Sequence, residues 1–152
     1  MHKRRDTLKQ SAVVAGLLAA TGLFPRYAAA AWNTQAFEAK SVADVMKAFG
    51  AAAPTASNDV TLTAPDIAEN GAVVPMGVAT TLPNVKHMLV MVEKNPNTLV
   101  AKFDTSDAVE PNFLTRAKMG QSSDVYAVAI TNDGKAFYAK KEVKVTLGDC
   151  GG

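Results

Sequence analysis

Residues 125–145 read VYAVAITNDGKAFYAKKEVKV, and this stretch decides the fold. Large and small apolar side chains alternate over residues 125–131, which is the period of two of a β-strand. Asn-Asp-Gly at 132–134 is a strong turn signal. Alternation resumes over 143–147, where valine and leucine are separated by lysine and threonine. The stretch therefore predicts an antiparallel hairpin between residues 125–131 and 136–145.

The same period of two extends upstream of the hairpin. Residues 60–64 alternate between apolar and threonine side chains, and residues 87–92 are almost all apolar, which predicts a more deeply buried strand. Turn signals at 70–71, 83–84 and 95–97 separate the runs. Roughly seven or eight short strands are expected, which favours a mainly β, antiparallel β-sandwich. Since no segment after Phe49 has a helical period, alternating β-α folds are disfavoured.

One helix is predicted ahead of the strands, over Ser41–Phe49, with a start that could lie as early as Gln35. Its apolar side chains share one face: Val42, Val45, Met46 and Phe49. Ser41 followed three residues later by Asp44 is a capping-box pattern, and Gly50 is a stop signal. The helix and a linker are assigned to residues 31–58, and the sandwich to residues 59–147.

Residues 1–30 have the three-part pattern of an export signal. A basic start at 3–5 precedes an apolar run over 12–24 and three alanines at 28–30. A membrane span needs about 20 apolar residues, so the run is too short for an anchor. Cleavage is expected after Ala30, with Ala31 as the alternative, and the mature chain is expected in the periplasm without a membrane anchor.

The pair Arg4-Arg5, followed by Leu8 and Lys9, is typical of the twin-arginine type of signal, although Lys3 and Thr7 depart from the usual pattern. That route exports folded proteins. Small proteins without a cofactor seldom need it, and one reason to use it is to leave the cytoplasm already joined to a partner that lacks its own signal.

Composition excludes several classes of function. The 152 residues carry a formal charge of +2, but residues 1–31 hold five basic residues and one acidic residue, which leaves −2 for the rest. An acidic body argues against a nucleic-acid partner. A single cysteine excludes an internal disulfide and a cysteine-rich zinc site. Because His87 is the only histidine after the leader, a histidine metal cluster or a Ser-His-Asp triad is disfavoured, and a structural role is expected for His87.

The chemistry is expected at residues 148–152, which read Gly-Asp-Cys-Gly-Gly. Gly148, Gly151 and Gly152 restrict the backbone least, so the segment is predicted to be a flexible arm. Asp149 and the terminal carboxylate oppose formation of a thiolate at Cys150. The thiol therefore suits a covalent carrier better than an enzyme nucleophile, and in an oxidising compartment it is also prone to intermolecular disulfides.

The chain resembles the SoxY family, the sulfur-compound carriers of bacterial thiosulfate oxidation. That family ends in a Gly-Gly-Cys-Gly-Gly arm after a Val-Lys-Val-Thr-like strand, and Asp149 departs from it where the family has glycine. The other similar blocks lie at 67–71 with 74–75, at 94–97, at 116–119 and at 125–128. The resemblance covers about Phe37 to Gly152.

This resemblance implies an immunoglobulin-like sandwich that pairs with a second subunit, SoxZ. It also implies that Cys150 is the covalent attachment site of inorganic sulfur species and that the protein has no catalytic activity or cofactor of its own. The haem enzyme SoxAX would load thiosulfate, the manganese hydrolase SoxB would release sulfate, and SoxCD would oxidise the remaining sulfur. All three contacts would be transient.

Two alternatives remain open at this point. The terminal Gly151-Gly152 pair is also typical of ubiquitin-like sulfur carriers, which hold cargo on a terminal thiocarboxylate, although the export signal argues against that class. The second alternative is a binding or structural module whose Cys150 only forms an intermolecular disulfide.

The remaining candidate residues have structural interpretations. Glu93 and Lys94 beside a turn are expected to be solvated. The body methionines are expected in the core or in an interface: Met46, Met76, Met88, Met91 and Met119. Together with the apolar run 87–92, they are predicted to supply an exposed apolar patch for the partner.

Overall fold

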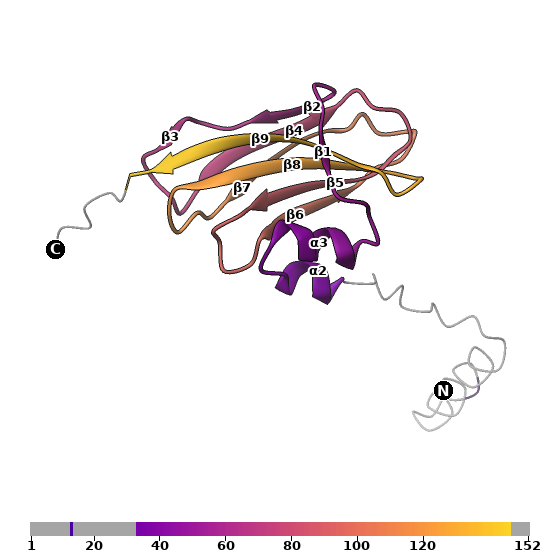
Figure 1. Ribbon diagram of the computed structural model, residues 1–152, viewed down its shortest axis with the longest axis horizontal. Coiled ribbons are helices and arrows are strands. Elements are labelled where there is room, and N and C mark those ends of the chain that lie inside the picture. Colours follow the sequence, from indigo (N-terminus) through magenta and orange to yellow (C-terminus); the bar gives the residue numbers. More distant parts are fainter. Residues whose placement is uncertain (1–12, 14–32, 147–152) are drawn as a thin grey trace, which may run out of the picture. The chain divides into compact units, whose positions relative to one another are not determined.

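The computed structural model describes residue 13 and residues 33–146 (Figure 1). Apart from residue 13, the predicted export signal lies outside the described residues, as do Trp32 and the predicted arm over residues 148–152. The part from residue 33 contains two helices, α2 (Thr34–Glu38) and α3 (Val42–Ala48). The strands are β1 (Thr55–Ala56), β2 (Val60–Thr63), β3 (Ile67–Ala68), β4 (Val74–Thr80), β5 (Val85–Val92), β6 (Leu99–Asp104), β7 (Asn112–Ala117), β8 (Ser123–Thr131) and β9 (Ala136–Val145).

The strands form two sheets, which confirms the predicted sandwich. The larger sheet has the order β1-β9-β8-β5-β6, with β3 also pairing with β9, and the smaller sheet has the order β2-β4-β7. The predicted hairpin is present as β8 and β9, in register from Ser123↔Val143 to Ile130↔Ala136. The long pairs are antiparallel, whereas the two-residue strands β1 and β3 both run parallel to β9.

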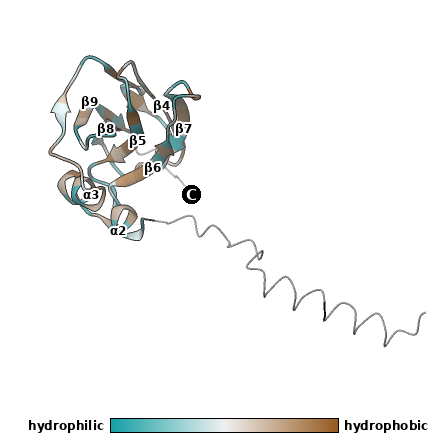
Figure 2. Ribbon diagram, turned by 90° about the vertical axis from the view of Figure 1, so that its right-hand side faces the viewer, coloured by the Kyte–Doolittle hydropathy of each residue, from teal (hydrophilic) through white to brown (hydrophobic). Residues whose placement is uncertain are grey.

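Two apolar clusters divide the molecule into three layers, which Figure 2 shows edge-on. One cluster fills the space between the sheets and includes Val78, Val90 and Val143. The other lies between the helices and the opposite face of the larger sheet, and includes Val45, Leu89 and Val128. A period of two is typical of a half-buried strand, and that interpretation of residues 125–131 is wrong for β8. Helices cover its second face, so residues 127–130 are all buried.

The N-terminal region contains two helices where one was predicted. Asn33 caps α2, because its Oδ1 accepts from the backbone N–H of Ala36 at 3.1 Å, and its Nδ2 donates to the Ala48 carbonyl at 3.0 Å. Ser41 caps α3 as predicted and accepts from the N–H of Asp44 at 3.2 Å. Gly50 ends α3 with φ +63°, the left-handed conformation that favours glycine.

The apolar run 87–92 does not provide the exposed patch predicted for it. Residues 88–92 are 0% exposed, because the run is the central strand β5 and the two clusters cover both of its faces. The five body methionines are buried too, which confirms their placement in the core. Glu93 and Lys94 are exposed as expected. No helix among the described residues is long and apolar enough to cross a membrane.

Candidate functional site

The candidate site is the end of the larger sheet from which the C-terminal segment continues. Cys150 follows the last residue of β9, Val145, by five positions and lies outside the described residues, as do Gly148, Asp149, Gly151 and Gly152. Five residues span at most about 18 Å, so the thiol stays within that distance of the strand end.

The end of β9 is held by hydrogen bonds to neighbouring segments. The N–H of Lys144 donates to the Asp66 carbonyl at 3.0 Å, and the N–H of Thr146 donates to the Ala68 carbonyl at 3.1 Å. The N–H of Val145 donates to the Ser122 hydroxyl oxygen at 2.9 Å. Backbone donors on consecutive residues are therefore satisfied up to the last described position, which gives the C-terminal segment a fixed starting point.

Gly71 packs against this strand end at a distance that no side chain permits. The N–H of Met119 donates to the Gly71 carbonyl at 2.7 Å. A Cβ on Gly71 would lie 2.5 Å from the Met119 carbonyl oxygen and 2.8 Å from Cγ1 of Val145. Glycine is thus required here by close approach, and the contact joins the loop after β3 to the loop after β7.

The turn between β5 and β6 completes the support. Asn95 donates from Nδ2 to the Lys118 carbonyl at 2.7 Å, and the N–H of Lys94 donates to the Ser123 hydroxyl oxygen at 3.0 Å. Three of the blocks that carry the sequence resemblance, 67–71, 94–97 and 116–119, therefore meet through these hydrogen bonds at one end of the sandwich. Sequence reasoning identified the blocks but missed Ser122, Ser123 and Gly71 as supports, although the Asn70-Gly71 turn signal was visible.

Cations are available at the same end. Arg116, Lys118 and Lys144 are exposed, and none makes an ion pair with another described residue. Lys141 is paired, with its Nζ 2.9 Å from Oδ1 of Asp66. Glu69 and Glu93 at the same end are exposed as well and make no ion pair with another described residue, so cations and carboxylates are both available there.

His87 lies at the opposite end of the larger sheet. It is in register with Ile130 beside the hairpin turn, whereas Val143 pairs with Ser123 near the site. Its Nδ1 is 2.6 Å from Oδ1 of Asp104. This partner was missed because the cross-strand register, rather than sequence spacing, brings the two residues together.

Burial is the main cause that lowers the pKa of His87, and it outweighs the opposing effect of Asp104. The pKa of Asp104 is lowered chiefly by the hydrogen bond from Lys102, whose Nζ lies 2.8 Å away. A neutral imidazole that donates to a carboxylate fits the structural role expected for His87. Among the described residues, no group of three His, Cys, Asp or Glu side chains is arranged to hold a metal.

Comparisons with known proteins show which family the chain is similar to. The family model described as sulfur oxidation protein SoxY matches residues 45–150. The solved structure of the sulfur carrier protein SoxY from Chlorobium limicola f. thiosulfatophilum is 33% identical, with a TM-score of 0.61, over 68% of this chain and 93% of that chain. A comparison with curated proteins finds no match.

A superoxide reductase (neelaredoxin) from Ignicoccus hospitalis is also similar in structure, with 19% identity and a TM-score of 0.52, over 59% of this chain and 81% of that chain. At that identity only the fold is shared.

Proposed function

The chain belongs to the SoxY family of sulfur oxidation proteins, and from that premise we propose that it is a covalent carrier of sulfur intermediates in thiosulfate oxidation, with the cargo on the thiol of Cys150. The observation that carries this proposal is that the family match extends to residue 150 and so includes the cysteine. The anchored end of β9 supports it, because a fixed strand end followed by a glycine-rich segment suits a tethered thiol.

Loading is an oxidation. The Cys150 thiol and thiosulfate join through a new S–S bond, giving a cysteine S-thiosulfonate, one proton and two electrons. The electrons pass to the haem enzyme SoxAX. The thiosulfonate is an anion. Lys118 and Lys144 are exposed cations at the same end, and neither makes an ion pair with another described residue, so they lower the cost of holding the anion near the strand end.

Unloading is a hydrolysis. Water attacks the terminal sulfonate sulfur, the S–S bond to that sulfur breaks, and SoxB releases sulfate and two protons while a persulfide anion remains on Cys150. SoxCD then takes six electrons from the outer sulfur of the persulfide while three water molecules supply oxygen, which leaves a cysteine S-sulfonate and releases six protons. A second hydrolysis breaks the remaining S–S bond, so that water gives sulfate and one proton and the Cys150 thiol is free again. The chain itself supplies the attachment point and no catalytic group, and no cofactor of its own is part of the proposal.

We place the mature chain in the periplasm, after export by the twin-arginine-like signal and cleavage near Ala30, as a heterodimer with SoxZ. Contacts with SoxAX, SoxB and SoxCD are transient, because one carrier serves all three. Nucleic acid is not a partner in this proposal, since the body carries a net negative charge.

Replacement of the cysteine tests the proposal. Cys150→Ser is expected to abolish sulfate formation from thiosulfate, with the free energy of unfolding within about 0.5 kcal/mol of the wild type. Intact mass spectrometry with peptide mapping of protein from thiosulfate-grown cells should find the added mass on Cys150. Cargo on Gly152 would instead support a thiocarboxylate carrier, and full activity of the serine variant would leave only a disulfide-forming module.

A further inference from the structure

One sheet face of the sandwich is left uncovered by residues 33–146, the part of the body that the structure describes. Helices and the smaller sheet cover the two faces of the larger sheet, and the smaller sheet turns its inner face to the core. No described element packs on its outer face. By strand alternation and groove lining, the residues on this outer face are Thr61, Thr63, Pro65, Pro75, Gly77, Ala79, Asn112, Leu114 and Arg116. They include one cation and no acidic residue, which is unusual for a face in water.

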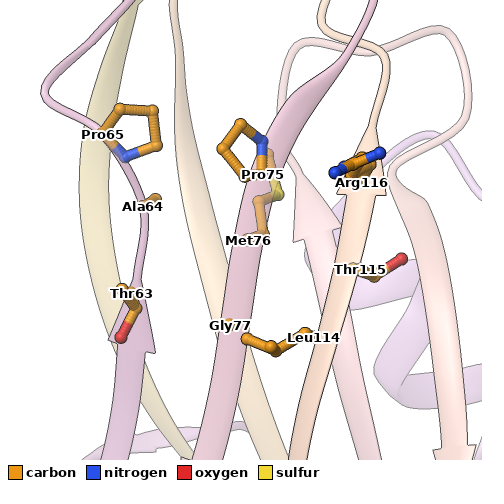
Figure 3. Close-up of a pocket in the computed structure, with 9 residues that line it drawn as sticks. All are labelled: Thr63, Ala64, Pro65, Pro75, Met76, Gly77, Leu114, Thr115 and Arg116. Atoms are coloured by element: carbon orange, nitrogen blue, oxygen red, sulfur yellow. The ribbon is translucent and has the colours of Figure 1, made fainter.

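A groove of about 730 Å³ crosses this outer face (Figure 3). Its floor is Gly77, where a Cβ would lie 3.0 Å from Cδ2 of Leu114 and 3.4 Å from Cβ of Thr63. Pro65 and Pro75 form the apolar wall, and Arg116 lies beside them. On this face the central strand β4 contributes Pro75, Gly77 and Ala79, and the Leu114 side chain lies over Gly77. A side chain inserted into the groove therefore packs against Leu114 and the two prolines.

Leu114 is the exposed large apolar side chain of this groove. It is 84% exposed, which is the largest value among the exposed large apolar residues described. Ile67 and Val73 are 57% and 50% exposed and lie two residues along the chain from the groove residues Pro65 and Pro75 respectively. A large apolar side chain exposed in an apolar groove marks an interaction surface, whereas scattered ones need no explanation.

The charge on this face indicates whether the protein that covers it is a second copy of this chain or a different protein. A two-fold dimer uses the same patch on both subunits. Pairing this face with itself would bring two Arg116 side chains together and supply no carboxylate. The guanidinium makes no ion pair with any other described residue. A different chain that presents a carboxylate satisfies it.

We infer that the outer face of the smaller sheet is the docking surface for the partner subunit of the proposed heterodimer. The partner places an apolar side chain in the groove against Leu114 and a carboxylate against Arg116. This inference rests on the proposed function for the existence of the partner. Since Val74 pairs with Ala117, close to the Gly71–Met119 contact, the docked partner adjoins the candidate site.

Binding between the mature chain and purified SoxZ, measured by titration calorimetry, tests the inference. Leu114→Glu removes the apolar contact and puts a carboxylate beside Arg116, where it competes with the carboxylate of the partner, so the dissociation constant is expected to rise at least about 30-fold. Arg116→Ala is expected to weaken binding about 10-fold and to reduce its dependence on salt. Val109→Glu is the matched control. Val109 is 45% exposed and does not line the groove, so the Val109→Glu variant should bind SoxZ with wild-type affinity.

A folding defect can be told apart from an interface defect. Leu114 is exposed, so the Leu114→Glu variant should unfold at the wild-type temperature, and weaker binding then reports on the interface. The inference is overturned if both groove variants bind SoxZ with wild-type affinity. It is also overturned if Leu114→Glu disrupts only complexes between copies of this chain. Cys150→Ser separates the two proposals, because it should lose sulfate formation and still bind SoxZ normally. A serine variant that retains sulfate formation instead overturns the carrier proposal.

Discussion

At the scale of single residues, Gly71 has the least freedom to change. Gly71→Ala puts a methyl group 2.5 Å from the Met119 carbonyl oxygen, so the two loops must separate. Overpacking of this kind costs about 1–3 kcal/mol. We expect a loss of that size in the free energy of unfolding, measured with denaturant.

Gly120 offers a matched control. A Cβ on Gly120 would meet nothing within 4 Å. Gly120→Ala should therefore leave stability unchanged or raise it slightly, because alanine reduces the freedom of the unfolded chain. Equal losses in the two variants would show that close packing at Gly71 is not the cause.

His87 makes stability depend on pH. Burial lowers its pKa in the folded state below the ordinary value of 6.5, so the unfolded state binds more protons as the pH falls below about 7. The free energy of unfolding should therefore decrease from pH 7 to pH 5. Asp104 does not contribute in this window, because its pKa is lowered from 3.8.

His87→Gln keeps a hydrogen-bond donor toward Asp104 and cannot titrate. Its free energy of unfolding should be flatter than that of the wild type between pH 7 and pH 5, as measured by denaturant unfolding at several pH values. A wild-type slope in the glutamine variant would assign the pH dependence to another group.

At the scale of elements, a helix or strand could be predicted only where its periodic pattern of apolar residues was long enough. The β8–β9 hairpin and helix α3 were predictable, because each repeats its period over several residues and has a turn or cap signal. Strands β1 and β3 have two residues each and exist only through pairing with β9. Helix α2 is five residues long and has no apolar stripe, so Asn33 and contacts with its surroundings fix it instead.

The base of the candidate site was predictable only in part. Residues 67–71, 94–97 and 116–119 were recognisable as blocks, yet their meeting depends on loop hydrogen bonds between residues about 20 or more positions apart. The exposed apolar patch was placed on residues 87–92, but coverage by the helices buries that run. The positions of apolar residues in the sequence did not reveal that the Leu114 side chain would be exposed.

Helix α3 depends on its N-cap. Ser41→Ala removes the acceptor for the Asp44 N–H and should cost about 1 kcal/mol, measured by thermal unfolding with circular dichroism. Ser41→Thr keeps a hydroxyl that accepts from the Asp44 N–H and donates to the Asp44 carboxylate, so it should recover most of the loss. A threonine variant as unstable as the alanine variant would assign the effect to something other than capping.

At the scale of the whole molecule, the three layers should open unequally. Strands β5 and β8 contribute to both apolar clusters, whereas α2 and α3 contribute to one. Helices of five and seven residues are also too short to be stable alone. Native-state hydrogen exchange should therefore show the amides of α2 and α3 opening at lower free energy than those of β5 and β8. Equal values in both regions would indicate a single cooperative unit.

The hydrogen bonds at the end of β9 also determine how the molecule bears a load. In the proposed function an enzyme acts on Cys150, and any pull that it exerts on the chain reaches the described structure at the end of β9. Bonds on both sides of the strand, to Ala68 and Ser122 among others, lie across the strand axis, so a pull along that axis strains them together rather than one after another. Such a shear geometry resists extraction of the strand, so the sandwich is expected to keep its shape while the proposed cargo is being handled.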